Sequence, residues 1–152
     1  LFNDIASKDT LLISKLVNPF GSQSIVVSID IKRNIFNKPK IYSYLKKKKL
    51  RYNWVNFIRN LSDLGVGEIL LNSVDRDGLL KGPDNELVEI LSKEINIPIV
   101  YLGGIASLDD MKKLINSGAS AVAAGSFFCF YGPHKAVLLT YPNYEEIKSL
   151  FS

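Results

Sequence analysis

Four short apolar runs alternate with segments of helical periodicity along the 152-residue chain. The runs are rich in β-branched residues and occupy positions 24–29, 68–71, 97–102 and 120–124. Their apolarity is continuous rather than alternating, which is typical of strands buried on both faces. Strands of this kind separated by helices form βαβ units with right-handed crossovers. The pattern therefore predicts an α/β fold with a parallel sheet.

The helices between these strands have recognisable ends. The segments 52–64 and 84–94 show helical periodicity, and Gly65 is suited to end the first of them. A third helix is expected between Ser107, whose hydroxyl can cap its first turn, and Gly118. Shorter helices are expected at 11–17, 126–130 and 144–151. An apolar stripe on the first long helix is expected to pack on the sheet and consists of Trp54, Phe57, Ile58 and Leu61.

The segment 32–49 does not fit the alternation and predicts a β-hairpin or long loop with its turn at 37–39. It follows directly after the first strand, on the side where α/β proteins bind their ligands. Its run of four lysines, 46–49, is interpreted as a solvated loop, with a clamp on an anionic ligand as the alternative.

Composition limits the class of protein. The length suits one soluble domain, here residues 1–152. The 19 Lys and Arg against 15 Asp and Glu give a net charge of +4, and four of the positive charges lie in the lysine run, which argues against a nucleic-acid protein. No apolar stretch is long enough to span a membrane. A single cysteine, Cys129, fits a reducing cytoplasm without disulfides. Because the chain starts at Leu1 and has one methionine, Met111, we expect it to be a piece of a longer protein.

Polar or glycine-rich residues follow all four predicted strands. Asp30 ends the first strand, and Asp77 follows the second. In a β/α barrel these strand ends meet on one face, where the active site is built. The two carboxylates can then work as an acid and an orienting or binding group, although an aspartate after a strand is also a common turn or cap residue. Asp30 favours the catalytic interpretation because it ends an apolar strand, where a buried carboxylate is costly without a role.

The glycine-rich ends of the last two strands resemble phosphate-binding loops. The third strand ends in Gly103 and Gly104, and the fourth in Gly125 and Ser126. Glycines let a ligand approach the backbone, and the amides opening a short helix at Ser126 would point at an anion. Barrels often bind phosphate between the loops after their last two strands. A tight turn is the alternative for an isolated pair of glycines.

Four other polar or reactive residues receive a structural interpretation. Asp75 and Arg76 are expected to pair with each other or with neighbours. His134, the sole histidine, is interpreted as a surface turn residue. Cys129 is interpreted as a small core residue, because nothing nearby in the sequence would lower its pKa.

Four segments carry a resemblance to a known family. They read FGSQSIVVSIDIKR at 20–33, GVGEILLNSVDRDGLLKGPD at 65–84, IPIVYLGGIAS at 97–107 and GASAVAAGSFF at 118–128. Together they resemble the cyclase subunit of imidazole glycerol phosphate synthase, HisF, over nearly the whole chain. The resemblance implies a (β/α)8 TIM barrel, of which this chain covers the carboxyl-terminal half, strands five to eight.

The resemblance also implies a chemistry. HisF receives ammonia from a glutaminase partner, HisH, and uses it to cleave and cyclise a doubly phosphorylated ribulosyl nucleotide, without a cofactor or metal. Asp30 falls on one of its two catalytic aspartates, and Glu68 on a charged residue of the ammonia gate. By the same resemblance, substrate-binding and phosphate-binding positions of this half fall on Asp77, Gly78, Gly104 and Ser126, and Asn3 falls on a binding position of the other phosphate site.

Three residues depart from the pattern of the histidine-pathway enzyme. Asn72 stands where that enzyme typically has Thr, Leu102 where it has Ser, and Gly125 where it has Ala. These departures resemble a paralogous branch that amidates an amino sugar in surface-polysaccharide synthesis. A non-catalytic, phosphate-binding half-barrel scaffold is the alternative. We also expect this chain either to pair with an amino-terminal half or to self-associate, because open strand edges invite pairing.

Overall fold

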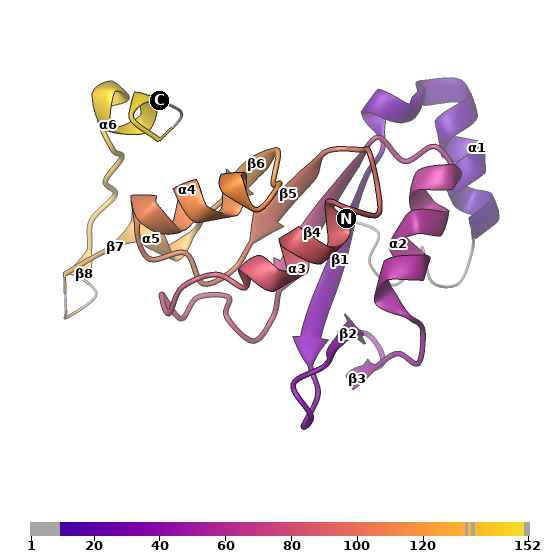
Figure 1. The fold of residues 1–152 in the computed structure, drawn as a ribbon, viewed down its shortest axis with the longest axis horizontal. Helices are drawn as coiled ribbons and strands as arrows, with labels where there is room; N and C mark the ends of the chain where they lie inside the picture. The colour runs from indigo at the N-terminus through magenta and orange to yellow at the C-terminus, as the bar shows by residue number, and fades with distance from the viewer. Residues whose placement is uncertain (1–9, 133, 135, 151–152) are drawn as a thin grey trace.

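The computed structural model describes residues 10–132, 134 and 136–150, and it contains the predicted parallel sheet (Figure 1). The sheet has six strands in the order β3-β2-β1-β4-β5-β6. Its four parallel strands are β1 (Val26–Arg33), β4 (Glu68–Ser73), β5 (Ile99–Leu102) and β6 (Ala121–Ala123). They correspond to the four apolar runs of the sequence. The α/β prediction is therefore confirmed.

The insertion after β1 contains β2 (Pro39–Ser43) and β3 (Lys48–Lys49), which pair as a hairpin. A hairpin was predicted, but its turn lies at 44–47 rather than at 37–39, and residues 34–38 connect β1 to β2. Strand β2 also pairs antiparallel with the end of β1, where Ile31 lies opposite Ile41. The insertion thus folds back onto the last three residues of β1, positions 31–33.

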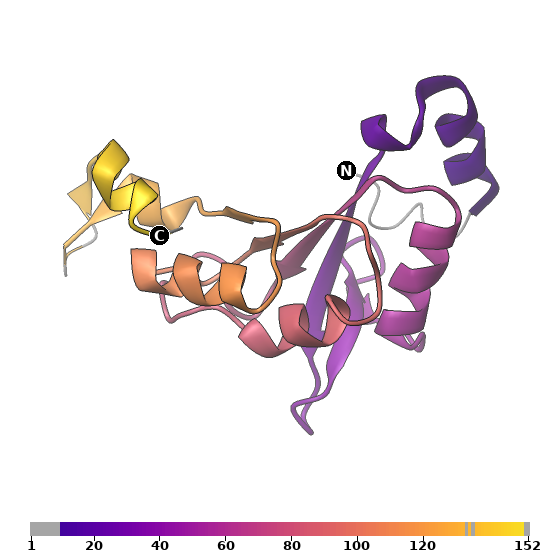
Figure 2. The same cartoon turned by 45° about the horizontal axis from the view of Figure 1, so that its top comes forward.

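Three helices cover one face of the sheet (Figure 2). They are α2 (Trp54–Asp63), α3 (Asn85–Leu91) and α4 (Leu108–Asn116). Ser107 caps α4 as predicted, since its hydroxyl accepts a hydrogen bond from the Asp110 amide at 3.1 Å. Gly65 and Gly118 follow the first and last of these helices with φ of 90° and 105°, a conformation that favours glycine.

The remaining elements lie toward the two ends of the described chain. They are α1 (Thr10–Phe20), η1 (Ser22–Ser24), α5 (Ser126–Cys129), β7 (Phe130–Tyr131), β8 (Ala136–Val137) and α6 (Tyr144–Lys148). Helix α1 runs three residues past the predicted 11–17, to Phe20. The small β7-β8 hairpin was not predicted, because its strands are only two residues long and carry no clear periodicity.

The sheet's pleat divides its residues between two faces. The buried side chains of the core point toward the three helices. They include Val27, Ile29, Ile31, Ile69, Leu71 and Tyr101. We call the opposite side the inner face. It carries Ser28 and Asp30 of β1, Glu68, Leu70 and Asn72 of β4, and Val100 and Leu102 of β5. Leu70, Val100 and Leu102 are half-buried there. In a closed barrel this face turns inward.

Within the described residues, the structure has no helix of the length and apolarity needed to cross a membrane.

Candidate functional site

Asp30 lies near the carboxyl end of β1, on the inner face, and only 7% of its surface is exposed. Parallel pairing places it beside Asn72 of β4. The Asn72 side-chain amide donates a 2.7 Å hydrogen bond to Asp30 Oδ1. A buried carboxylate needs such donors, because burial without them is costly. The buried position that the sequence predicted for Asp30 is confirmed.

Six of the predicted binding residues line one small hollow at this end of the sheet. They come from three successive loops, after β4, β5 and β6: Asp77, Gly78, Gly103, Gly104, Gly125 and Ser126. The loops meet because parallel strands end at the same edge. Leu102, which departs from the family pattern, also lines the hollow.

The glycines of this hollow differ in what they provide. Gly103 and Gly104 have φ of 117° and 80°, and an added Cβ at Gly104 would lie 2.4 Å from the Gly82 carbonyl oxygen. Gly125 has φ of −96°, and an added Cβ there would meet nothing within 4 Å. Within the part of the chain that the structure describes, the amides of Gly104 and Ser126 donate to no protein acceptor. These two amides are therefore candidate donors to an anion.

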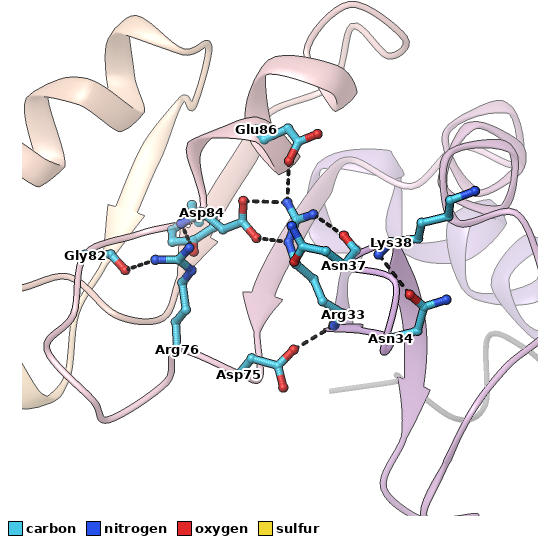
Figure 3. A network of polar contacts seen from close by, with 10 residues as sticks. Arg33, Asn34, Asn37, Lys38, Asp75, Arg76, Gly82, Asp84 and Glu86 are labelled. Carbon is cyan, nitrogen blue, oxygen red and sulfur yellow. Dashed lines mark hydrogen bonds and ion pairs between the residues drawn. The ribbon is translucent and has the colours of Figure 1, made fainter.

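A network around Arg33 ties the loops of this end together (Figure 3). Arg33 makes two hydrogen bonds to the Asp84 carboxylate, of 2.7 Å from Nε and 2.8 Å from Nη2. It also donates to Glu86 Oε2 and to the Asn37 carbonyl, each at 2.6 Å. Hydrogen bonding to Asp84, followed by that to Glu86, raises the pKa of Arg33. The sequence did not single out Arg33, because its carboxylate partners, Asp84 and Glu86, are about fifty residues away along the chain.

The same network continues to the hollow. Arg76 donates to the Gly82 carbonyl at 3.0 Å, and the Gly82 amide donates to the Gly104 carbonyl at 2.8 Å. Asp75 accepts a 2.6 Å hydrogen bond from the Arg33 amide. Asp75 and Arg76 thus pair with neighbours, one of the two outcomes expected for them. The loop after β4 is therefore hydrogen-bonded to β1 through Asp75 and to the loop after β5 through Gly82.

Tyr44, which follows β2 in the hairpin, interacts electrostatically with the carboxylates of Asp30 and Asp77. Burial raises the pKa of its phenol, and the negative charges of Asp30 and Asp77 raise it further. A raised pKa favours the protonated phenol, which can donate a hydrogen bond. Tyr44 is 55% exposed and packs edge-on against Tyr42, with ring centroids 5.0 Å apart.

Comparison with known proteins decides the family. The family model described as histidine biosynthesis protein matches residues 1–134, most of the chain. The chain belongs to this family.

Individual relatives are HisF proteins. One from Pseudomonas aeruginosa, with the provisional name imidazole glycerol phosphate synthase subunit hisF2, is 39% identical over 146 residues, which are 95% of this chain and 58% of the relative. A provisionally named HisF of Leptospira interrogans is 37% identical over 153 residues, 99% of this chain and 60% of the relative. The HisF of Sulfolobus acidocaldarius is 41% identical over 123 residues, 81% of this chain and 48% of the relative. The chain thus spans about half to three fifths of the length of these relatives.

The strands and helices described above are those of a partial (β/α) barrel of the HisF family. Glu68, the expected gate residue, is half-buried on the inner face, at the opposite end of β4 from Asn72. Among the described residues it forms no ion pair. Asn3, the remaining expected binding residue, lies outside the described residues.

Among the residues that received a structural interpretation, His134 and Cys129 do not line the hollow. His134 is exposed, in the turn between β7 and β8, as predicted. Cys129 is half-buried at the end of α5, so the prediction that it is a core residue is only partly met. Lys46, Lys47 and Lys48 are exposed, in keeping with a solvated loop.

Proposed function

We propose that this chain is the carboxyl-terminal half-barrel, residues 1–152, of a HisF-like subunit that adds ammonia to a phosphorylated substrate. One observation carries the proposal: a hollow lined by glycines and Ser126 lies at the same end of the sheet as the buried carboxylate of Asp30. Such a pairing suits a substrate that is anchored by its phosphate while a carboxylate moves a proton.

Each part of the site has a role in this reaction. The amides of Gly104 and Ser126, with the Ser126 hydroxyl, bind the phosphate. Asp30 acts as a general acid and base at the atoms where ammonia adds and the ring closes. In the family that the sequence resembles, a second aspartate on the other half of the barrel complements it. Asp77 and Gly78 line the hollow and bind the substrate beside its phosphate.

Two substrates compete under this proposal. One is the ribulosyl nucleotide of histidine biosynthesis, and the other is an amino sugar of the paralogous branch. Leu102 lines the hollow and replaces a hydroxyl with an apolar side chain, which favours a substrate other than the histidine-pathway nucleotide. The provisional hisF2 name of the Pseudomonas relative fits a second, paralogous copy.

The experiment supplies the complete protein with ammonium and either the ribulosyl nucleotide or a nucleotide-linked amino sugar. Nitrogen incorporation into one of them is expected. Isothermal titration with glycerol phosphate tests the hollow separately. Gly125→Asp adds a carboxylate where a side chain has space, so it is expected to abolish phosphate binding, whereas Lys46→Ala in the exposed loop changes it less than about twofold. Binding without incorporation of nitrogen from ammonium would favour the scaffold alternative.

We further propose that a HisH-like glutaminase docks at the opposite end of the barrel, where Glu68 forms part of an ammonia gate. The support is its position on the inner face, at the other end of β4 from the proposed chemistry. Glu68→Ala is expected to lower the glutamine-driven rate of the complex while leaving the rate with saturating ammonium nearly unchanged. Equal loss of both rates would reduce Glu68 to a structural residue.

A further inference from the structure

Asn72 occupies the position next to Asp30 in the sheet. Strand pairing places it between Asp30 on β1 and Leu102 on β5, at one level of the inner face. Its Nδ2 donates a 2.7 Å hydrogen bond to Asp30 Oδ1. The nitrogen of the Asn72 amide is therefore the end that faces Asp30, and its Oδ1 is the end that remains.

The other end of the Asn72 amide has no partner. Its Oδ1 is fully buried and accepts no hydrogen bond within the described part of the protein. Buried polar atoms without partners are rare in folded proteins, and each one calls for an explanation such as a role in binding or catalysis. A carbonyl oxygen is only an acceptor, so the missing partner is a group that carries an N–H or O–H.

The neighbouring side chains on the same face do not supply that donor. Leu102 on the adjacent strand is apolar, and so is Leu70, two residues earlier on β4. Asp30 already takes its hydrogen bond from the Asn72 nitrogen. These neighbours leave Asn72 Oδ1 without a donor, so a group of a bound molecule can supply one.

We propose that Asn72 is a positioning and specificity-determining residue: its nitrogen orients Asp30, and its carbonyl oxygen accepts a hydrogen bond from an amino or hydroxyl group of the substrate. This deepens the proposed function and rests on it. The substrate class it selects has a hydrogen-bond donor adjacent to the atom on which Asp30 acts. A substrate without that donor would leave Oδ1 buried and unpaired. The cost of that unpaired oxygen makes the site select strongly against such substrates.

Two variants of the complete protein test the nitrogen and the oxygen of the Asn72 amide separately. Asn72→Asp keeps an acceptor oxygen of the same shape but loses the donor to Asp30. Asn72→Leu is of similar size and loses both. Asn56→Leu is the matched control, because Asn56 is an exposed asparagine on α2.

Steady-state kinetics with ammonium and the accepted substrate give the test. Both Asn72 variants are expected to lower kcat at least about thirtyfold, since a general acid-base residue is worth about a hundredfold or more. Only Asn72→Leu is expected to raise KM for the substrate, by about tenfold, as expected for a lost hydrogen bond. Equal KM values in the two variants, or an unchanged kcat in Asn72→Leu, would overturn the proposal.

A second measurement works without turnover. Hydrogen exchange of the Asn72 side-chain amide, followed by nuclear magnetic resonance and assigned by its absence in Asn72→Leu, is expected to be slow and to become fast in Asp30→Leu. Fast exchange in the unmodified protein would refute the contact with Asp30. Slow exchange in a protein that turns over neither candidate substrate would refute the proposed function and leave the positioning of Asp30 by Asn72 standing.

Discussion

Arg33 at the end of β1 and Asp84 at the start of α3 form a bidentate ion pair, with hydrogen bonds of 2.7 and 2.8 Å. The two residues are 51 positions apart in the chain. Both side chains are largely buried, with 16% and 7% of their surfaces exposed. The pair joins the strand that carries Asp30 to the end of the loop that lines the hollow. It thereby fixes the spacing of the two parts of the proposed site.

Removing one partner is expected to be costly, because the other charge is left buried. Arg33→Met is expected to lower the free energy of unfolding by about 3 kcal/mol, the usual scale for breaking a buried ion pair. Arg51→Met, at an exposed arginine without a described ion pair, is expected to change it by less than about 0.5 kcal/mol. Urea unfolding of the complete protein measures both. Equal small losses would show that the Arg33 network contributes little.

Two glycines of the hollow are expected to respond to alanine in opposite directions. Gly104→Ala is expected to cost about 2 kcal/mol or more, because of its positive φ and the nearby Gly82 carbonyl. Gly125→Ala is expected to stabilise by about 0.4 to 1 kcal/mol, since its backbone conformation suits alanine and the added methyl group has space. Urea unfolding decides the sign. Destabilisation by Gly125→Ala would contradict the geometry of the β6 end.

The fold was predictable where a local pattern determines it. The four apolar runs and the Ser107 cap carry their own signals, and the structure follows them. The β7-β8 hairpin was missed because two-residue strands have no periodicity. The pairing of β2 with the end of β1 was not predicted, because the match of Ile31 with Ile41 depends on how the insertion folds back.

The site was predictable to the extent that strand ends converge. This rule brought Gly78, Gly104 and Ser126 into one hollow without any knowledge of distances. The Arg33–Asp84 pair was not predictable, because nothing in either residue's local sequence marks the other as its partner. Asn72 was noted only as a departure from a family pattern. Its unpaired oxygen is a property of the packed structure and has no signal in the sequence.

Tyr44 offers a test of the electrostatics around Asp30. Burial raises the pKa of the Tyr44 phenol, and the carboxylates of Asp30 and Asp77 raise it further because they oppose a second negative charge. Asp30→Asn removes one of those charges, so it is expected to lower the Tyr44 pKa toward its ordinary value. Asp63→Asn, at an exposed position on α2, serves as the control. Titration of the tyrosine ring carbons by nuclear magnetic resonance, assigned with Tyr44→Phe, measures the shift, and equal pKa values in both variants would contradict the placement of Tyr44.

The inner face predicts the behaviour of the 152-residue chain on its own. Leu70, Val100 and Leu102 are half-buried there, and β6 is the last strand of the described sheet. Open strand edges and apolar sheet faces favour pairing. We therefore expect this chain to self-associate unless an amino-terminal half covers the face. Sedimentation equilibrium at micromolar concentration measures this, and a single species of 17.0 kDa would contradict it.

The central claim is that Asp30 performs proton transfer in an ammonia-using reaction, and one rate measurement tests it most directly. In the complete protein, Asp30→Asn is expected to lower ammonium-driven turnover by at least about a hundredfold, as for a general acid-base residue. His134→Ala, at the exposed turn between β7 and β8, is expected to leave the rate unchanged. Circular dichroism of each variant checks that the fold is intact. A correctly folded Asp30→Asn protein with unaltered kcat and KM would contradict the account and reduce Asp30 to a structural residue of β1.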